Sequence, residues 1–268
     1  MEFNSMETPG RTERTWWDTG VFLVLLAAAA VGSAAIFPYA SQLTRIDFAE
    51  LGISYEAAWI ASAVQSTVLA AIAIFIGMRL GHGIGLGPRN LRALLTSGEG
   101  ARRELNAGLR WGIPLGAVAA LVIVMLDLTV FAEALLGVEA APSPAVWAAL
   151  LASLYGGIVE EILLRLGVMT FLVWLLVKVS GSAESGGWPI VVGNIGAALL
   201  FGAGHLPATA TIVPLTALVV LRALMLNGIP GVAFGWLYAR YGLLAAIASH
   251  FTADIVLHVI LPMLSIGG

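Results

Sequence analysis

Residues 147–177 read WAALLASLYGGIVEEILLRLGVMTFLVWLLV, and this stretch decides how the chain folds. It is long enough to cross a membrane as a helix, yet Glu160, Glu161 and Arg165 lie near its middle. An ionisable side chain at the centre of a membrane span costs about 2.5 to 3.5 kcal/mol on insertion scales. Three such residues so close together indicate mutual pairing, a hydrated cavity, or both.

The whole chain has the composition of a membrane protein. Of its 268 residues, 59% are hydrophobic and 11% are charged, and the mean hydropathy is +0.95. A spanning helix needs about 20 apolar residues, because the hydrocarbon core is about 30 Å thick. Runs that meet or approach this length are 21–39, 59–80, 111–126, 147–177, 190–206, 212–226 and 243–266, with a shorter eighth run at 231–241. We therefore predict an all-α, polytopic transmembrane bundle of about eight helices that encloses an intramembrane polar cavity, in a multi-pass protein of the cell membrane.

Polar segments divide the chain into three parts. Residues 1–18 form a polar tail, of which 1–5 resemble a vector-derived leader; 19–140 are scaffold helices, and 144–264 are the predicted catalytic core. We take the run at 21–39 as a retained helix, because it exceeds the about 7 to 15 apolar residues of a signal peptide. The scaffold contains a basic loop at 81–106, which the positive-inside rule places in the cytoplasm. Counting eight helices outward from this loop would put both ends of the chain in the cytoplasm.

Two absences narrow the function. The chain has no cysteine, which excludes thiol nucleophiles and thiolate metal sites. The glycine-rich run at 81–87 resembles a dinucleotide-binding pattern only superficially, because it follows a membrane span rather than a strand. We predict no cofactor and no nucleic-acid partner.

Six polar residues are candidates for chemistry. Glu161 and Arg165 are four residues apart on one helix face and can pair, whereas Glu160 should point elsewhere. The alternative for this pair is a structural ion pair that joins two helices. His205 ends an apolar run just before Pro207, which should stop or kink the helix, and a histidine there is often only an interfacial side chain.

The last apolar run carries His250 and Asp254, again four residues apart. This spacing lets Asp254 accept a hydrogen bond from the imidazole and fix its tautomer. The alternative is a buried polar seam that packs helices together. Arg222 fits a snorkelling or anion-facing residue, and His258 fits packing near the membrane edge.

The joint pattern resembles one family. Glu160-Glu161-x3-Arg165, Phe201-x3-His205 and His250-x3-Asp254, in that order on three apolar helices, resemble the three motifs of the CAAX protease and bacteriocin-processing family of intramembrane glutamic proteases. This family includes the type II CAAX prenyl endopeptidases. The resemblance covers about residues 145–262, and it implies a metal-independent endopeptidase that cleaves a membrane-associated peptide or lipidated protein.

The resemblance also implies roles for the candidate residues. Glu160 and His205 would bind the attacking water, with Glu160 as general base, and Arg165 would hold Glu161. His250 and Asp254 would stabilise the oxyanion. Asp254 departs from the family members that have asparagine there, because an ionised carboxylate can only accept hydrogen bonds.

Two other functions fit the same residues. One is a non-proteolytic membrane scaffold or immunity protein that uses the polar seam for packing. The other is a metal-dependent membrane hydrolase with Glu160, His205 and His250 as ligands, although no His-Glu-x-x-His motif occurs. Arginine outnumbers lysine twelve to one, which hints at a GC-rich prokaryotic genome, where prenylated substrates would not be routine.

Overall fold

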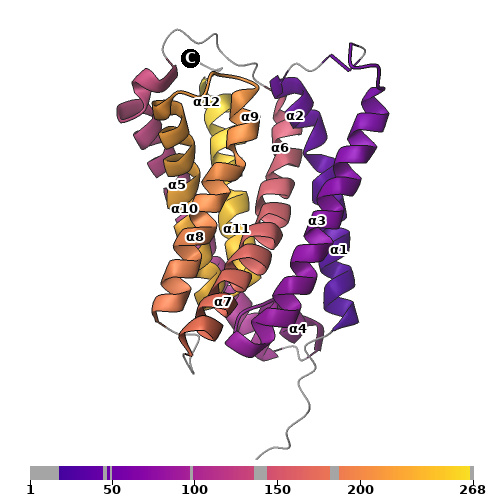
Figure 1. Ribbon diagram of the computed structural model, residues 1–268, viewed down its shortest axis with the longest axis vertical. Helices are drawn as coiled ribbons and strands as arrows, with labels where there is room; N and C mark the ends of the chain where they lie inside the picture. Colours follow the sequence, from indigo (N-terminus) through magenta and orange to yellow (C-terminus); the bar gives the residue numbers. More distant parts are fainter. Residues whose placement is uncertain are drawn as a thin grey trace, which may run out of the picture.

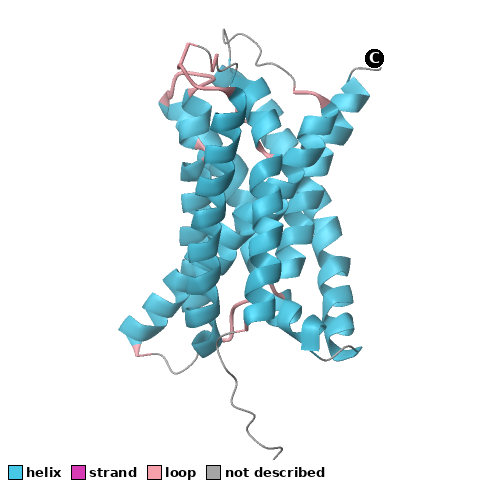
Figure 2. Ribbon diagram, turned by 90° about the vertical axis from the view of Figure 1, so that its right-hand side faces the viewer, coloured by secondary structure: helices cyan, strands magenta, loops and turns pink. Residues whose placement is uncertain are grey.

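The described part of the chain is helical throughout. The computed structural model describes residues 18–44, 47, 48, 50–96, 99–135, 144–181 and 187–265, and these contain no strand (Figures 1 and 2). The first half consists of α1 (Thr19–Ala35), α2 (Phe37–Thr44), α3 (Tyr55–Ile84), α4 (Arg89–Thr96), α5 (Glu99–Thr129) and the short 3₁₀ helix η1 (Ala132–Leu135). The second half consists of α6 (Val146–Leu154), η2 (Tyr155–Glu160), η3 (Ile162–Met169), α7 (Thr170–Ser180), α8 (Trp188–Gly204), α9 (Leu206–Ala210), α10 (Ala217–Tyr241), α11 (Leu243–Asp254), η4 (Ile255–Ile260) and α12 (Leu261–Ser265).

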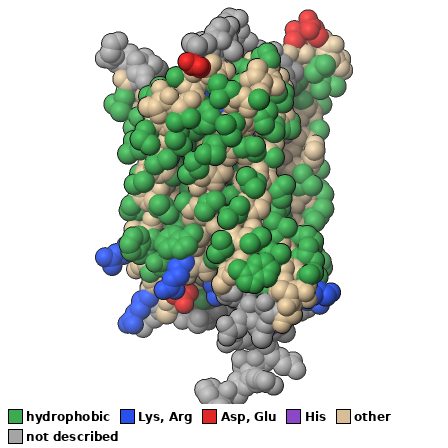
Figure 3. All heavy atoms as spheres, turned by 60° about the vertical axis from the view of Figure 1, so that its left-hand side comes forward, with side chains coloured by type: hydrophobic (Ala, Val, Ile, Leu, Met, Phe, Trp, Pro, Cys, Tyr) green, Lys and Arg blue, Asp and Glu red, His purple; other side chains and the backbone are tan. Residues whose placement is uncertain are grey.

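Seven helical segments are long and apolar enough to cross a membrane. They are Thr19–Thr44, Tyr55–Ile84, Arg102–Thr129, Val146–Ser180, Trp188–Ala210, Ala217–Tyr241 and Leu243–Leu264. Apolar side chains cover the visible flank of the bundle between its two ends (Figure 3). The prediction of an all-α, multi-pass membrane protein is confirmed.

The predicted separate run at 231–241 is wrong. It continues the run at 212–226 as the single helix α10, which contains Pro230 in its interior. With seven spans, α1 begins at the end of the bundle that holds α4, and α12 lies at the opposite end (Figure 1). The sequence-based prediction that both ends lie on the same side of the membrane is therefore wrong, because an odd number of spans puts the first and last described helices' outer ends on opposite sides.

The segment at 81–106 is more ordered than the predicted loop. Helix α3 continues to Ile84, α4 follows after a short turn, and α5 begins at Glu99. Lysine and arginine side chains gather at this end of the visible flank, whereas acidic ones predominate at the other end (Figure 3). The charge asymmetry on which the predicted orientation depends is thus a property of the folded molecule. The predicted tail falls outside the described residues, apart from Asp18, which caps α1.

Arg222 is an ion-pair partner, as the anion-facing alternative for this residue predicted. Its Nε and NH2 groups donate to the two carboxylate oxygens of Asp127, at 2.6 and 2.7 Å. This bidentate salt bridge joins the N-terminal part of α10 to the C-terminal part of α5. It satisfies both charges within the apolar bundle.

A glycine stripe brings α5 against α11, the helix that carries two candidate site residues. Gly108, Gly112 and Gly116 recur every fourth residue on α5. A methyl group on Gly112 would lie 2.7 Å from the carbonyl oxygen of Ala245, and one on Gly116 would overlap the carbonyl oxygen of Ser249. Such small-residue faces let membrane helices approach at backbone distance, which here fixes the position of α11.

Candidate active site

Three membrane spans bring the six predicted site residues together. The fourth span, α6 through α7, supplies Glu160, Glu161 and Arg165; α11 supplies His250 and Asp254. His205 follows directly after α8, and the break that Pro207 predicts is confirmed, because α9 starts at Leu206. The sequence motifs therefore meet in one place within the bundle.

The local backbone of the fourth span differs from a regular α-helix. Residues Tyr155–Glu160 and Ile162–Met169 are π-helical, and so is Ile255–Ile260, immediately after Asp254. π-Helical turns are rare and occur frequently at functional sites. Here the consequence is that neighbouring Glu160 and Glu161, expected to point in different directions, both reach the His250 ring.

Glu161 and Arg165 form the predicted pair at the closed side of the site. Their carboxylate and guanidinium groups lie 3.2 Å apart, with side chains 0% and 1% exposed. Arg165 also donates to the carbonyl oxygen of Gly231 at 2.9 Å and packs over the rings of Phe201 and Phe234. A buried charge pair needs such additional partners to offset its lost hydration.

His250 is held by Glu161 rather than by Asp254. Its Nδ1 lies 2.8 Å from Glu161 Oε1, and because a carboxylate accepts, Nδ1 carries the proton. Asp254 Oδ1 lies 3.7 Å from Nε2, beyond hydrogen-bond distance, so the predicted role of Asp254 in fixing the tautomer is wrong. Phe234 stacks on the imidazole with centroids 4.8 Å apart, which further restricts the ring.

Glu160 lies between the two imidazoles. Its Oε1 is 4.0 Å from His205 Nε2, and its Oε2 is 3.6 Å from His250 Nε2. The His205 Nδ1 lies 2.9 Å from the carbonyl oxygen of Phe201, so it donates there and Nε2 faces Glu160. The side chains of Glu160 and His205 are 19% and 33% exposed, so this edge of the site is the accessible one.

One known family matches this part of the chain. The family described as "Type II CAAX prenyl endopeptidase Rce1-like" matches residues 142–256, which contain all six residues above. Residues 142–256 are therefore similar to a family of proteases. The sequence-based resemblance is confirmed for this part of the chain, and the seven candidate spans support a multi-pass membrane protein. No curated protein and no solved structure gives a match.

The candidate site also depends on residues that the sequence did not indicate. Gly156 faces the site, where a methyl group would overlap the Asp254 carboxylate and lie 3.3 Å from His250 Nε2. Its signal in the sequence is the Gly156-Gly157 pair, one turn before the glutamates in a helix of bulky residues. Phe234 had no such signal, because one aromatic residue in an apolar helix is indistinguishable from lipid-facing bulk.

The metal-dependent alternative needs a set of ligands that lie close together. Among the described residues, no group of three or more His, Asp or Glu side chains is placed to hold a metal ion. The metal-hydrolase alternative therefore has no candidate ligand set in this part of the chain.

Proposed function

We propose that this protein is an intramembrane endopeptidase that hydrolyses a peptide bond in a membrane-associated or lipid-modified, CAAX-like substrate. The observation that carries the proposal is the position of Glu160, a partly accessible carboxylate between His205 and His250. The protease character of the Rce1-like family supports it. No thiol is available to the chain, and activated water is the nucleophile that a carboxylate flanked by imidazoles can provide.

In this proposal Glu160 and His205 hold the attacking water. The 4.0 Å between Glu160 Oε1 and His205 Nε2 is too long for a direct hydrogen bond and suits two groups that share one water molecule. His205 Nε2 accepts one proton of that water, while Glu160 removes the other as the oxygen attacks the peptide carbonyl. Glu160 then transfers its proton to the departing amine as the C–N bond breaks.

His250 and Asp254 serve the oxyanion side. Because His250 Nδ1 donates to Glu161, only a doubly protonated ring can also donate from Nε2 to the oxyanion. Asp254, 3.7 Å from this nitrogen, supports the charged ring or, when protonated, donates a second hydrogen bond. Glu161 and Arg165 are positioning residues, since they act on the substrate only through the His250 ring.

A peptide assay in detergent tests the proposal. Purified wild-type protein and a His205→Ala variant of matched thermal stability are incubated with quenched CAAX peptides, farnesylated or unmodified, with and without a chelator. We expect wild type to cleave the farnesylated peptide faster, without loss in chelator, and His205→Ala to be at least about 10²-fold slower.

Each other outcome identifies an alternative. Loss of turnover in chelator together with bound zinc would support the metal-dependent hydrolase. Absence of cleavage for every peptide in a library, from stable wild-type protein, would support the non-proteolytic scaffold or immunity protein.

A further inference from the structure

The exposure of the site residues increases toward one end of the bundle. Along the fourth span, the side chain of Glu160 is 19% exposed, whereas those of Glu161 and Arg165, nearer α7, are 0% and 1% exposed. Along the last span, side-chain exposure rises toward α12, from 7% at His250 to 15% at Asp254. Because α6 and α12 lie toward the same end of the bundle (Figure 1), both spans open in that direction.

Helix α8 shows the same direction of access. Phe201 is 4% exposed, whereas the side chain of His205, immediately before α9, is 33% exposed. Gly204 beside it is exposed, and a methyl group there would meet no atom within 4 Å. Helix α9 lies at the same end as α12 (Figure 1). Three separate helices therefore place the accessible edge of the site toward this end of the bundle, which we call the open end.

The opposite direction is closed by buried side chains. Met169 and Val173, which lie between the site and the C-terminal end of the fourth span, are both 0% exposed, and Tyr238 on α10 is 1% exposed. The Tyr238 hydroxyl lies 2.7 Å from the hydroxyl of Thr170 and accepts from the backbone N–H of Gly87 at 2.8 Å. These hydrogen bonds join the end of α3 to α7 and α10, so a peptide that entered from this closed end would have to separate three helices.

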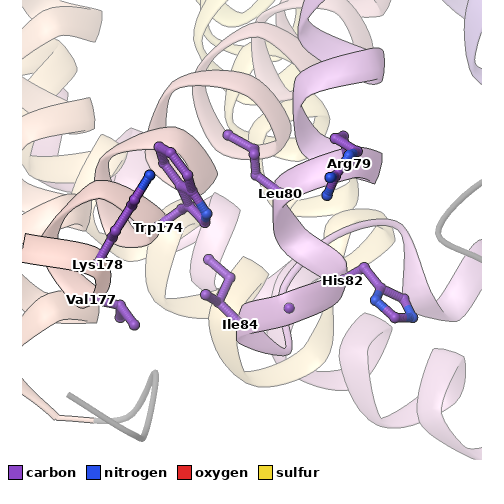
Figure 4. Close-up of a pocket in the computed structure, with 8 residues that line it drawn as sticks. Arg79, Leu80, His82, Ile84, Trp174, Val177 and Lys178 are labelled. Carbon is purple, nitrogen blue, oxygen red and sulfur yellow. The ribbon is translucent and has the colours of Figure 1, made fainter. Parts of the chain in front are cut away.

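A pocket at the closed end does not reach the site. It has a volume of about 290 Å³ and lies between α3 and α7, with Leu80 and Ile84 on one wall and Trp174 on the other (Figure 4). None of the six site residues lines it. Buried Met169 and Val173 precede Trp174 along the fourth span, and they separate the pocket from the site.

The two ends of the bundle differ in charge. The closed end is basic, whereas acidic side chains predominate at the open end (Figure 3). Arg222, nearer the open end, is paired with Asp127. Because lysine and arginine concentrate on the cytoplasmic side of membrane proteins, the charge pattern predicts that the open end faces away from the cytoplasm. The basic residues at the closed end include Arg89, Arg92, Arg102, Arg103, Lys178 and Arg240, and the acidic residues at the open end include Asp47, Glu50, Glu56 and Glu133.

We propose that water and substrate reach this site from the open end, on the side of the membrane opposite the cytoplasm. The inference rests on the proposed peptidase function and narrows its substrate class. The scissile peptide bond belongs to a membrane-anchored or lipid-modified chain whose cleavable segment has been exported. A reaction that translocates this segment across the membrane must therefore precede its cleavage.

Thiol labelling measures the direction of access without reference to activity, because the chain has no cysteine of its own. The variant His205→Cys is treated with a charged, membrane-impermeant methanethiosulfonate in right-side-out and in inside-out membrane vesicles. Gly204→Cys gives the same comparison if His205→Cys does not fold. Glu56→Cys and Arg240→Cys report the outer and inner faces, and Met169→Cys reports the buried layer at the closed end.

We expect His205→Cys to react at least about tenfold faster in right-side-out vesicles, because a charged reagent crosses the hydrocarbon core poorly. Glu56→Cys should follow it, Arg240→Cys should react faster in inside-out vesicles, and Met169→Cys should react in neither. Faster reaction of His205→Cys in inside-out vesicles, or equal rates in both, would overturn the proposal. Reaction only after detergent is added would also overturn it, because the site would then open to lipid alone.

A cleavage assay with the same vesicles separates this inference from the proposed function. A charged, membrane-impermeant quenched peptide is added to wild-type vesicles, and we expect cleavage by intact right-side-out vesicles and, after detergent only, by inside-out ones. Labelling from the outside without cleavage of any peptide, even in detergent, would refute the proposed function and with it the substrate class, while the direction of access would stand. Cleavage by intact inside-out vesicles would refute the direction of access and leave the peptidase function intact.

Discussion

Arg165 connects several parts of the candidate site. It pairs with Glu161, donates to the backbone of α10 at Gly231, and packs over two aromatic rings. Glu161 in turn holds the His250 imidazole. In the proposed mechanism, the guanidinium acts on the chemistry at a distance, by fixing the carboxylate that fixes the ring.

The Arg165→Met variant tests this dependence. It would leave the fully buried Glu161 charge without its cation, and removal of one member of a buried pair typically costs about 3 to 5 kcal/mol. We expect a loss of unfolding free energy of this size in detergent, measured by denaturant titration, and no change for the exposed Arg103→Met control. Adding Glu161→Gln to Arg165→Met should recover part of the loss, because it removes the stranded charge. No recovery would mean that packing, rather than charge, makes Arg165 important.

Part of the residue-scale account could be predicted from the sequence. The spacing of Glu161 and Arg165 predicted their pairing, since residues four apart on a helix are neighbours. The partner of His250 could not be predicted, because Asp254 and Glu161 are both carboxylates that could hold the ring, and only tertiary packing places Glu161 at Nδ1 within hydrogen-bond distance. The Asp127 partner of Arg222 was missed for the same reason, being 95 residues away.

At the scale of elements, the π-helical segments determine which side chains meet. A regular helix would turn Glu160 and Glu161 about 100° apart, whereas here Glu160, at the end of η2, and Glu161, between η2 and η3, both reach one imidazole. The length of the apolar run predicted a helix over this span but could not predict the π segments, because α-helical and π-helical turns in a membrane have the same apolar composition. The Gly156-Gly157 pair was the one local sequence feature that indicated a close approach between this span and another helix.

Gly156 permits the close approach of η2 to α11, and Gly156→Ala tests its importance. The added methyl group would displace the Asp254 carboxylate and contact the His250 ring. Because misplacement of catalytic groups by about 1 Å can cost about 10²-fold in rate, we expect a loss of peptidase turnover of that order, with the bundle still folded. Gly100→Ala on α5 is the control, since a methyl group there has no neighbour within 4 Å. Unchanged turnover in Gly156→Ala would show that the site tolerates a wider separation of these elements.

At the scale of the whole molecule, the charge pattern and the number of spans together define the topology. Apolar composition predicted the membrane bundle, and six of the eight predicted runs correspond to separate spans. The other two merge into α10, because Pro230 lies within a continuous helix instead of ending one. Sequence alone could not show this, since neighbouring helices and waters can satisfy the backbone that a proline frees.

Cysteine labelling tests the topology, because the chain has no cysteine of its own. Single variants Arg102→Cys, Glu50→Cys and Met263→Cys are treated in intact cells with a membrane-impermeant maleimide. With seven spans and the basic end inside, we expect Glu50→Cys and Met263→Cys to react in intact cells, and Arg102→Cys only after permeabilisation. Met263→Cys reacting on the same side as Arg102→Cys would instead require an even number of crossings.

The proposed function depends on Glu160 as the base that activates water, and one rate comparison tests it most directly. Turnover of the best farnesylated peptide is measured for wild type, Glu160→Gln and the exposed control Glu104→Gln, at matched folded fractions. General-base catalysis contributes about 10²- to 10⁴-fold, so we predict a loss in that range for Glu160→Gln and none for Glu104→Gln. Equal turnover of Glu160→Gln and wild type would contradict the account.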